Sequence, residues 1–66
     1  MIGDKIRELR ESKNMRQEDL CNLLSVKQAT LSQYELNKRT PDIYMLIKIA
    51  DIFRVSLDYL CERYKY

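Results

Sequence analysis

The chain has 66 residues, 45% of them hydrophobic, with only one Gly and one Pro, which is enough for one small globular domain spanning residues 1–66. Its 12 basic and 10 acidic residues give a net charge of +2, and it has two cysteines and no histidine. This composition argues against a zinc site, a cofactor and a small-molecule substrate, and no apolar run is long enough for a membrane span. We expect a cytoplasmic protein in which Cys21 and Cys61 are reduced thiols, a disulfide between them being the alternative.

The first predicted element is an amphipathic helix at the N-terminus. Ile2, Ile6 and Leu9 recur at helical spacing among charged residues. The helix is expected to end near Lys13-Asn14, because Asn tolerates the left-handed conformation that often follows a helix. This segment therefore offers one apolar face to a core and ends in a tight turn.

Residues 17–35 contain two short helical segments joined by a turn. The first is predicted over residues 17–24 with its leucines turned inward, and the second over residues 28–35 with Leu31 and Tyr34 buried. Ser25 and Val26 form the turn between them. Since the buried residues occupy one side of the second helix, its outer face carries small or uncharged side chains, namely Gln28, Ala29, Ser32 and Gln33.

The net charge of the chain is concentrated in the same region. Residues 20–41 hold three basic residues and a single acid, Glu35, and the rest of the chain holds nine residues of each sign. An uncharged hydrogen-bonding face flanked by cations suits a DNA groove, because amide side chains can read base edges and cations can meet phosphates. The pattern therefore predicts a sequence-specific DNA-binding protein.

Two further helices complete an all-α prediction of five helices and no strand. Thr40-Pro41-Asp42 is typical of a helix start, with Thr40 as N-cap and Pro41 in the first helical position, and this helix should run to about Phe53. It is apolar around most of its circumference, so we expect it to be buried on several sides or to border a subunit contact. Ser56 should cap a last helix whose apolar side comprises Leu57, Leu60, Cys61 and Tyr64.

Residues 17–41, QEDLCNLLSVKQATLSQYELNKRTP, resemble the lambda-repressor-like, Cro-type helix-turn-helix of the XRE family of transcriptional regulators. The residues that stand in the register of that motif are Gln17, Leu20, Leu24, Val26, Leu31, Ser32, Tyr34, Glu35, Arg39 and Pro41. The similarity extends over about residues 2–60. It implies a compact five-helix DNA-binding domain in which the second and third helices form the helix-turn-helix.

Five positions depart from the family motif. Cys21 replaces a small Ala, whereas Ser25 and Asn37 replace glycines, so Ser25 must adopt a left-handed conformation at some cost. Arg16 and Lys27 replace the Ser or Thr that usually caps the two helices of the motif, and a lost cap costs about 1 kcal/mol. Either both cations reach phosphates beside the groove, or these changes are neutral at exposed helix starts.

The resemblance assigns DNA contacts position by position. In this family the second helix of the motif enters the major groove of double-stranded DNA, which makes the base-contacting candidates Lys27, Gln28, Ala29, Ser32 and Gln33. The phosphate-contacting candidates are Arg16, Gln17, Asn37, Lys38 and Arg39. Arg10 and Glu35 are similar to a structural ion pair that links the first helix to the end of the recognition helix, so we expect a scaffold role for them.

Proteins of this family usually bind palindromic operators as two-fold dimers, with half-sites about 34 Å apart. The resemblance therefore implies a homodimeric repressor, and the dimer surface is expected at Arg54, Val55, Leu57 and Tyr59. With no room for a ligand-sensing domain, regulation is expected from concentration, from a protein antagonist or from a segment outside this chain. Activation through contact with polymerase is the alternative to repression.

Two other classes of function compete with DNA binding. An antitoxin-like or adaptor module would use the same fold to bind protein, but it should expose apolar anchors where the third helix has Gln, Ser, Lys and Ala. An enzyme would need a base, an activated nucleophile or a phosphate-binding loop, and the chain has no His, no thiol beside a base and no glycine-rich loop. We therefore expect a regulator and no enzymatic activity.

Overall fold

The computed structural model describes residues 1–61, which form five helices and no strand. The helices are α1 (Ile2–Ser12), α2 (Gln17–Leu24), α3 (Gln28–Glu35), α4 (Ile43–Phe53) and α5 (Leu57–Leu60). The all-α prediction is confirmed, and α2 and α3 have the predicted bounds. Tyr64, predicted on the apolar side of the last helix, lies outside the described residues. No helix within residues 1–61 is long and apolar enough to cross a lipid bilayer.

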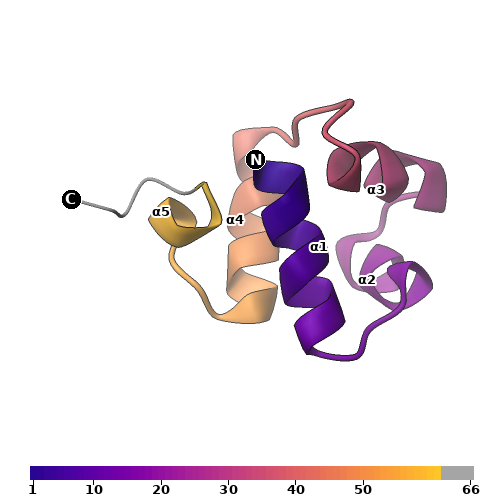
Figure 1. Cartoon of the computed structure of the whole chain (residues 1–66), viewed down its shortest axis with the longest axis horizontal. Coiled ribbons are helices and arrows are strands. Elements are labelled where there is room, and N and C mark those ends of the chain that lie inside the picture. The colour runs from indigo at the N-terminus through magenta and orange to yellow at the C-terminus, as the bar shows by residue number, and fades with distance from the viewer. Residues whose placement is uncertain (62–66) are drawn as a thin grey trace.

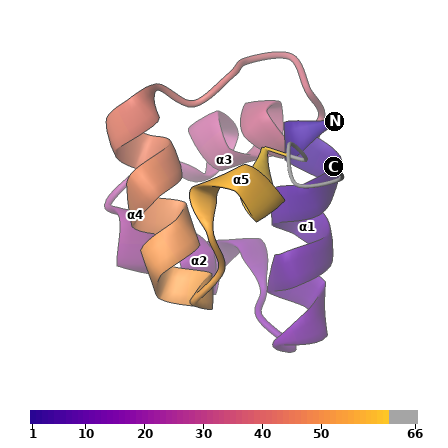
Figure 2. The same cartoon turned by 90° about the vertical axis from the view of Figure 1, so that its left-hand side faces the viewer.

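One apolar core joins all five helices. In Figure 1, α1 lies in front, with α2 and α3 on one side of it and α4 and α5 on the other, and Figure 2 shows α5 between α1 and α4. α1 contacts both α3 and α5, and α2 contacts both α3 and α4. The fully buried side chains are Ile6, Leu20, Leu24, Leu31, Ile49 and Leu60. The position of α3 is therefore set by α1 and α2 together.

The N-terminus of α1 lies directly against the end of α3. Asn37 has a left-handed backbone (φ 62°), and its Oδ1 accepts a hydrogen bond from the backbone N–H of Gly3 at 2.8 Å. Its Nδ2 donates to Asp4 Oδ1 at 3.3 Å. A Cβ on Gly3 would overlap the carbonyl oxygen of Tyr34, so this approach of the two helices requires glycine.

The two replaced N-caps of the helix-turn-helix behave differently. Arg16 offers no acceptor to the free amides of α2, but Asp19 Oδ2 accepts the backbone N–H of Arg16 at 2.9 Å, which is one half of a capping box. This hydrogen bond lowers the pKa of Asp19. Lys27 at the start of α3 makes no side-chain cap bond. The loss of the usual cap is therefore partly offset in α2 and uncompensated by a side chain in α3.

Left-handed residues other than glycine follow four of the helices, and the one after α3 is Asn37, described above. Asn14 (φ 56°) and Ser25 (φ 57°) adopt this conformation as predicted, after α1 and α2 respectively. Arg54 (φ 55°) ends α4 in the same way, which was not predicted. Because a Cβ crowds the left-handed region, each such residue carries a conformational cost that glycine would avoid.

Replacing Ser25 by Gly is expected to raise the free energy of unfolding by about 0.5–1 kcal/mol. Glycine removes a left-handed penalty of about 1–2 kcal/mol, but it also makes the unfolded chain more flexible. Urea denaturation followed by circular dichroism measures the change. The matched control is Ser12→Gly, because Ser12 is the last residue of α1 and does not have a left-handed backbone, so its replacement should lower stability instead. A loss of stability in both variants would contradict the cost assigned to this turn.

The predicted start of α4 is wrong by two residues. Asp42 is the N-cap, since its Oδ1 accepts a hydrogen bond from the backbone N–H of Met45 at 2.9 Å, and the helix begins at Ile43. Thr40 is therefore not the cap, and Pro41 precedes the helix. An Asp carboxylate is as good a cap as Thr, and its charge also favours the positive end of the helix.

α4 is also less buried than its sequence predicts. It buries Leu46, Ile49, Ala50 and Phe53, whereas the exposed fractions of Ile43, Tyr44 and Ile47 are 50%, 80% and 44%. Burial on several sides is therefore wrong within this chain. The other expectation, a subunit contact along α4, stays a prediction.

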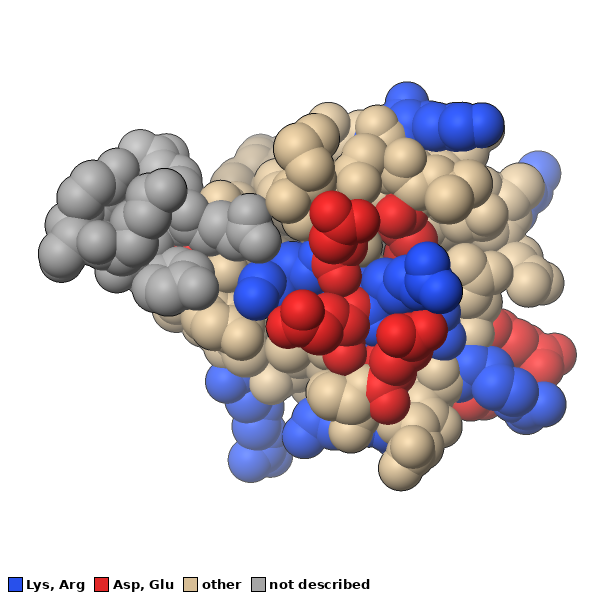
Figure 3. Space-filling view, in the orientation of Figure 1, with Lys and Arg blue, Asp and Glu red and all other residues tan. Residues whose placement is uncertain are grey.

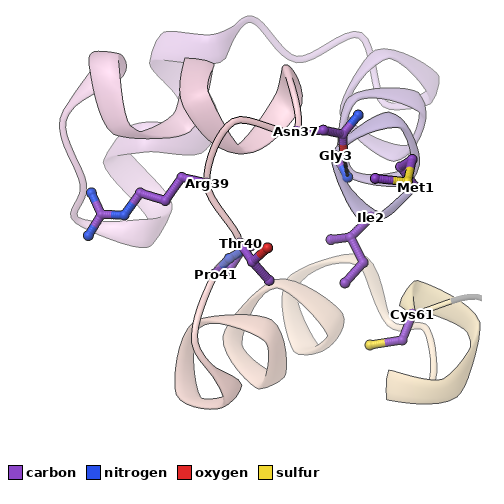
Figure 4. A pocket seen from close by; sticks show the side chains of 8 residues that line it. All are labelled: Met1, Ile2, Gly3, Asn37, Arg39, Thr40, Pro41 and Cys61. Carbon is purple, nitrogen blue, oxygen red and sulfur yellow. Dashed lines mark hydrogen bonds between the residues drawn. The ribbon is translucent and has the colours of Figure 1, made fainter.

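Both cysteines are free, as expected. Cys21 is buried in the core on the inner side of α2, and burial raises the pKa of its thiol. Cys61 is half-buried after α5 and lines a hollow beside the N-terminus of α1 (Figure 4). The thiol of Cys21 is therefore poorly suited to form a reactive thiolate.

Candidate nucleic-acid interface

α3 turns an apolar face to the core and a polar face to the outside. Leu31 and Tyr34 are buried, and they lie one turn apart on the inner side. The predicted base-contacting residues share the opposite side: Ser32 is half-buried, and the exposed ones are Lys27, Gln28, Ala29 and Gln33. The structure therefore brings the whole predicted set together on one accessible surface.

A chain of hydrogen bonds runs from this surface into the interior. Gln28 Nε2 donates to Gln17 Oε1 at 3.3 Å, and Gln17 Nε2 donates to Glu35 Oε1 at 3.1 Å. The Glu35 carboxylate also accepts from Arg10 Nε at 2.7 Å and Nη2 at 3.1 Å. Arg10 Nη1 donates to the carbonyl oxygen of Met15 at 2.7 Å. The side chain of Gln28 is thus oriented by contacts that reach α1.

The inner end of this chain is a buried ion pair. The side chains of Arg10 and Glu35 are only 11% and 4% exposed, and the two hydrogen bonds between them make the pair bidentate. The hydrogen bond to Glu35 raises the pKa of Arg10. Because Arg10 neutralises the one acid of α3, the recognition face presents no negative charge of its own.

Unpaired cations border the polar face of α3. Lys27, Lys38 and Arg39 are exposed, and within residues 1–61 none of them forms an ion pair. The charges of α1 instead pair with one another, and Figure 3 shows blue and red side chains interleaved over this helix. At the upper edge of the same view blue atoms are surrounded by uncharged residues on the face that is drawn. Arg39 points away from the hollow next to it (Figure 4).

Three of the predicted phosphate contacts are already engaged within the protein, and the hydrogen bonds of Gln17 to Glu35 and Gln28 are described above. The guanidinium of Arg16 lies 3.6 Å from Asp19 and 3.7 Å from Glu18, so its charge is shared with acids of its own helix. The amide oxygen and the amide nitrogen of Asn37 both form hydrogen bonds with the first turn of α1, as described above. We therefore assign Asn37 to the scaffold and keep Lys38 and Arg39 as the stronger candidates.

Two residues that shape this site were not predicted. Lys48 of α4 donates from Nζ to the carbonyl oxygen of Leu24 at 3.2 Å, which satisfies the end of α2 beside the turn. No local pattern reveals this contact, because the residues are 24 positions apart. Gly3 left a signal: the chain's single glycine sits inside a helix, where glycine is unfavourable without a packing reason.

The four residues expected at a dimer surface surround the turn between α4 and α5. Arg54 is exposed, and Val55, Leu57 and Tyr59 are half-buried. The ring of Tyr59 packs against α1, with Lys5 Nζ 4.7 Å from its centroid. Part of this surface is therefore already covered by the chain itself.

The paired short helices, the left-handed turn between them and the outward polar face of the second helix define a helix-turn-helix protein. A model of the helix-turn-helix family matches residues 6–60, and the chain belongs to this family. The chain is 35% identical over 62 residues to YqaE, an uncharacterized HTH-type transcriptional regulator of Bacillus subtilis (strain 168). That alignment covers 94% of this chain and 53% of YqaE. The chain spans about half the length of the curated relatives it matches.

Two solved structures are similar to the whole described fold. The P22 c2 repressor, crystallised in complex with a synthetic operator, has a TM-score of 0.84 and 28% identity, with 91% of each chain covered. SinR, a master regulator for biofilm formation solved in complex with DNA, has a TM-score of 0.83 and 32% identity, covering 92% of this chain and 98% of that one. The predicted lambda-repressor-like fold is confirmed.

Proposed function

We propose that this chain is a sequence-specific DNA-binding regulator of transcription whose helix α3 enters the major groove of double-stranded DNA. The observation that carries the proposal is the exposed amide face of α3, bordered by the cations Lys27, Lys38 and Arg39, which are exposed and have no ion-pair partner among residues 1–61. The two solved neighbours bound to DNA support it. An adaptor module that binds protein through α3 is disfavoured, because the outer face of this helix carries no large apolar side chain.

In this proposal the base edges are read by the outer residues of α3. A glutamine amide can form two hydrogen bonds with adenine, which suits Gln28 and Gln33, and the methyl group of Ala29 can lie against a thymine methyl. Lys27 can donate to guanine, and Ser32 can bond to either kind of base. Because the side chain of Gln28 is hydrogen-bonded to Gln17, its amide group is oriented before DNA binds.

Phosphate contacts would fix the position of α3 on the duplex. Lys38 and Arg39 supply them from the loop after α3, and Arg16 and Gln17 lie at the start of α2, where free backbone amides favour an anion. Such contacts add affinity to every sequence and carry no sequence information. They therefore predict a strong dependence of binding on salt.

We further propose a homodimer that represses transcription by occupying a palindromic operator in the cytoplasm, with one domain made by residues 1–66. A single helix of eight residues spans only a few base pairs, too few for useful specificity. The exposed apolar residues of α4 and the half-buried residues around Leu57 offer surfaces for the second subunit. Regulation by a protein antagonist belongs to the same proposal.

Selection of bound duplexes from a random pool tests this function directly. We expect enrichment of a palindrome with half-sites about one helical turn apart, and two chains per duplex by native mass spectrometry. Recovery of the pool without enrichment would overturn sequence-specific binding. Enrichment of a single half-site by one chain would overturn only the dimer.

Replacing Lys38 or Arg39 by Ala is expected to weaken binding to all duplexes and to reduce the salt dependence of log K by about one unit for each residue. The reason is that each lost phosphate contact releases about one counterion fewer. Fluorescence anisotropy at several KCl concentrations measures the slope. Lys13→Ala is the matched control, because Lys13 is an exposed cation at the other end of α1. A slope that stays unchanged in K38A and R39A would remove these residues from the interface.

A further inference from the structure

A groove of about 440 Å³ lies where α1 and α4 end. Both cartoon views place these helix ends at the bottom of the molecule and α3 at the top (Figures 1 and 2). The groove is formed by the turn between α1 and α2, the outer side of α2 and the last turn of α4. The residues lining it are Lys13, Met15, Leu23, Ile52, Phe53 and Arg54.

The groove is lined by apolar residues and by two cations. Leu23 is 51% exposed although it is a large aliphatic residue, and Met15 and Ile52 beside it are half-buried. Lys13 and Arg54 are exposed and form no ion pair within the described part of the chain. Apolar surface next to unpaired positive charge suits a ligand that is both apolar and acidic.

The two cations that line the groove lie at tight turns. Lys13 is followed by Asn14, which has a left-handed backbone, and Arg54 is itself left-handed and ends α4. The backbone N–H of Met15 bonds to the carbonyl oxygen of Arg10 at 3.1 Å, and that of Val55 bonds to the carbonyl oxygen of Ala50 at 3.0 Å. Because the cations sit on ordered turns, a partner would meet a largely preformed site.

We propose that this groove binds an acidic amphipathic helix of a partner protein. Apolar side chains spaced one turn apart would cover Leu23 and Ile52, and acidic residues on the same helix would lie beside Lys13 and Arg54. A second copy of this chain fits less well, because the exposed apolar strip of α4 is flanked by one basic and one acidic residue, Lys48 and Asp51. Since α3 lies at the other end, DNA and this partner can bind together.

A pair of synthetic helical peptides tests the proposal on the full chain. Both carry the same leucines at i, i+3, i+4 and i+7, and the flanking residues are all Glu in one peptide and all Lys in the other. In NMR titrations the acidic peptide should shift the amides of Leu23, Phe53 and Arg54 and leave α3 unchanged. It should bind about tenfold more tightly than the basic peptide.

Variants of the groove make the test independent of the choice of peptide. The double variant Lys13→Glu/Arg54→Glu should reverse the preference, so that the basic peptide binds more tightly. Leu23→Gln should weaken both peptides by about tenfold, because it removes apolar contact area. Should the double Glu variant fail to fold, Lys13→Gln/Arg54→Gln should still abolish the preference. DNA affinity should be unchanged in Leu23→Gln, because Leu23 belongs neither to the DNA interface nor to the expected dimer surface, and this separates the proposal from the proposed function.

Three results would overturn the proposal. Equal binding of the two peptides would remove the charge complementarity on which it rests. If the peptide shifted only the amide signals of Ile43, Tyr44 and Ile47, it would bind to the exposed apolar strip of α4 and not to the groove. Concentration-dependent shifts of the groove residues without peptide would show that a second copy of this chain occupies the groove.

Discussion

Replacing Arg10 by Met is expected to lower the free energy of unfolding by about 3–5 kcal/mol. The Glu35 carboxylate would stay 4% exposed without its bidentate partner, and an uncompensated buried charge is strongly destabilising. A domain of this size has a total stability of about 5 kcal/mol, so R10M should retain only about 0–2 kcal/mol and should unfold at very low urea concentration at 25 °C. Circular dichroism at 222 nm and urea denaturation measure the loss.

Two further variants identify the cause of that loss. Arg7→Met breaks the Arg7–Glu11 pair of the same helix, but those side chains are 59% and 55% exposed, so the cost should stay below about 1 kcal/mol. The double variant Arg10→Met/Glu35→Leu should recover most of the stability, because it leaves no charge in the interior. If the double variant were as unstable as R10M, loss of packing and not the buried charge would be responsible.

Replacing Gln28 by Ala is expected to weaken binding to the selected operator by about 1–3 kcal/mol and to relax the preference at one base pair. Binding to unrelated duplexes should hardly change, because the amide reads bases and not phosphates. Stability should hold within about 0.5 kcal/mol, since Gln28 is exposed. Anisotropy titrations with operator and scrambled duplexes give the comparison.

The control for Gln28 is another exposed amide. Asn22 lies on α2 and was not assigned to the interface, so Asn22→Ala should leave both affinities unchanged. A loss that is equal for operator and scrambled DNA in Q28A would contradict base reading. It would indicate instead that Gln28 only supports the orientation of α3.

Local sequence signals predicted the helix-turn-helix well. The bounds of α2 and α3 follow from buried residues at helical spacing and from the turn at Ser25, all within a few positions of one another. The start of α4 was misplaced because Thr40 and Asp42 are both good caps, and only the Asp42 hydrogen bond to Met45 distinguishes them. The exposure of α4 was missed because periodicity shows which residues are apolar but not how many helices cover them.

The candidate site also has features that the local sequence predicts and features that it does not. The outer face of α3 follows from the inward positions of Leu31 and Tyr34, and so it could be predicted. The role of Asn37 could not, because its partner Gly3 lies 34 residues away. The contact of Lys48 with Leu24 depends likewise on how α4 packs against α2. Contacts between distant segments require the tertiary arrangement, which the local pattern does not contain.

The bond between Asn37 and the first turn of α1 has a consequence for how tightly DNA can be held. It anchors the segment just before Lys38 and Arg39 to the first turn of α1, so that part of the backbone ordering, about 1–2 kcal/mol for each residue, is already completed when the protein folds. Lys38 and Arg39 therefore lose less conformational entropy when the protein binds a duplex. If this loop were flexible in the free protein, the entropy cost of ordering it would be added to the free energy of binding DNA.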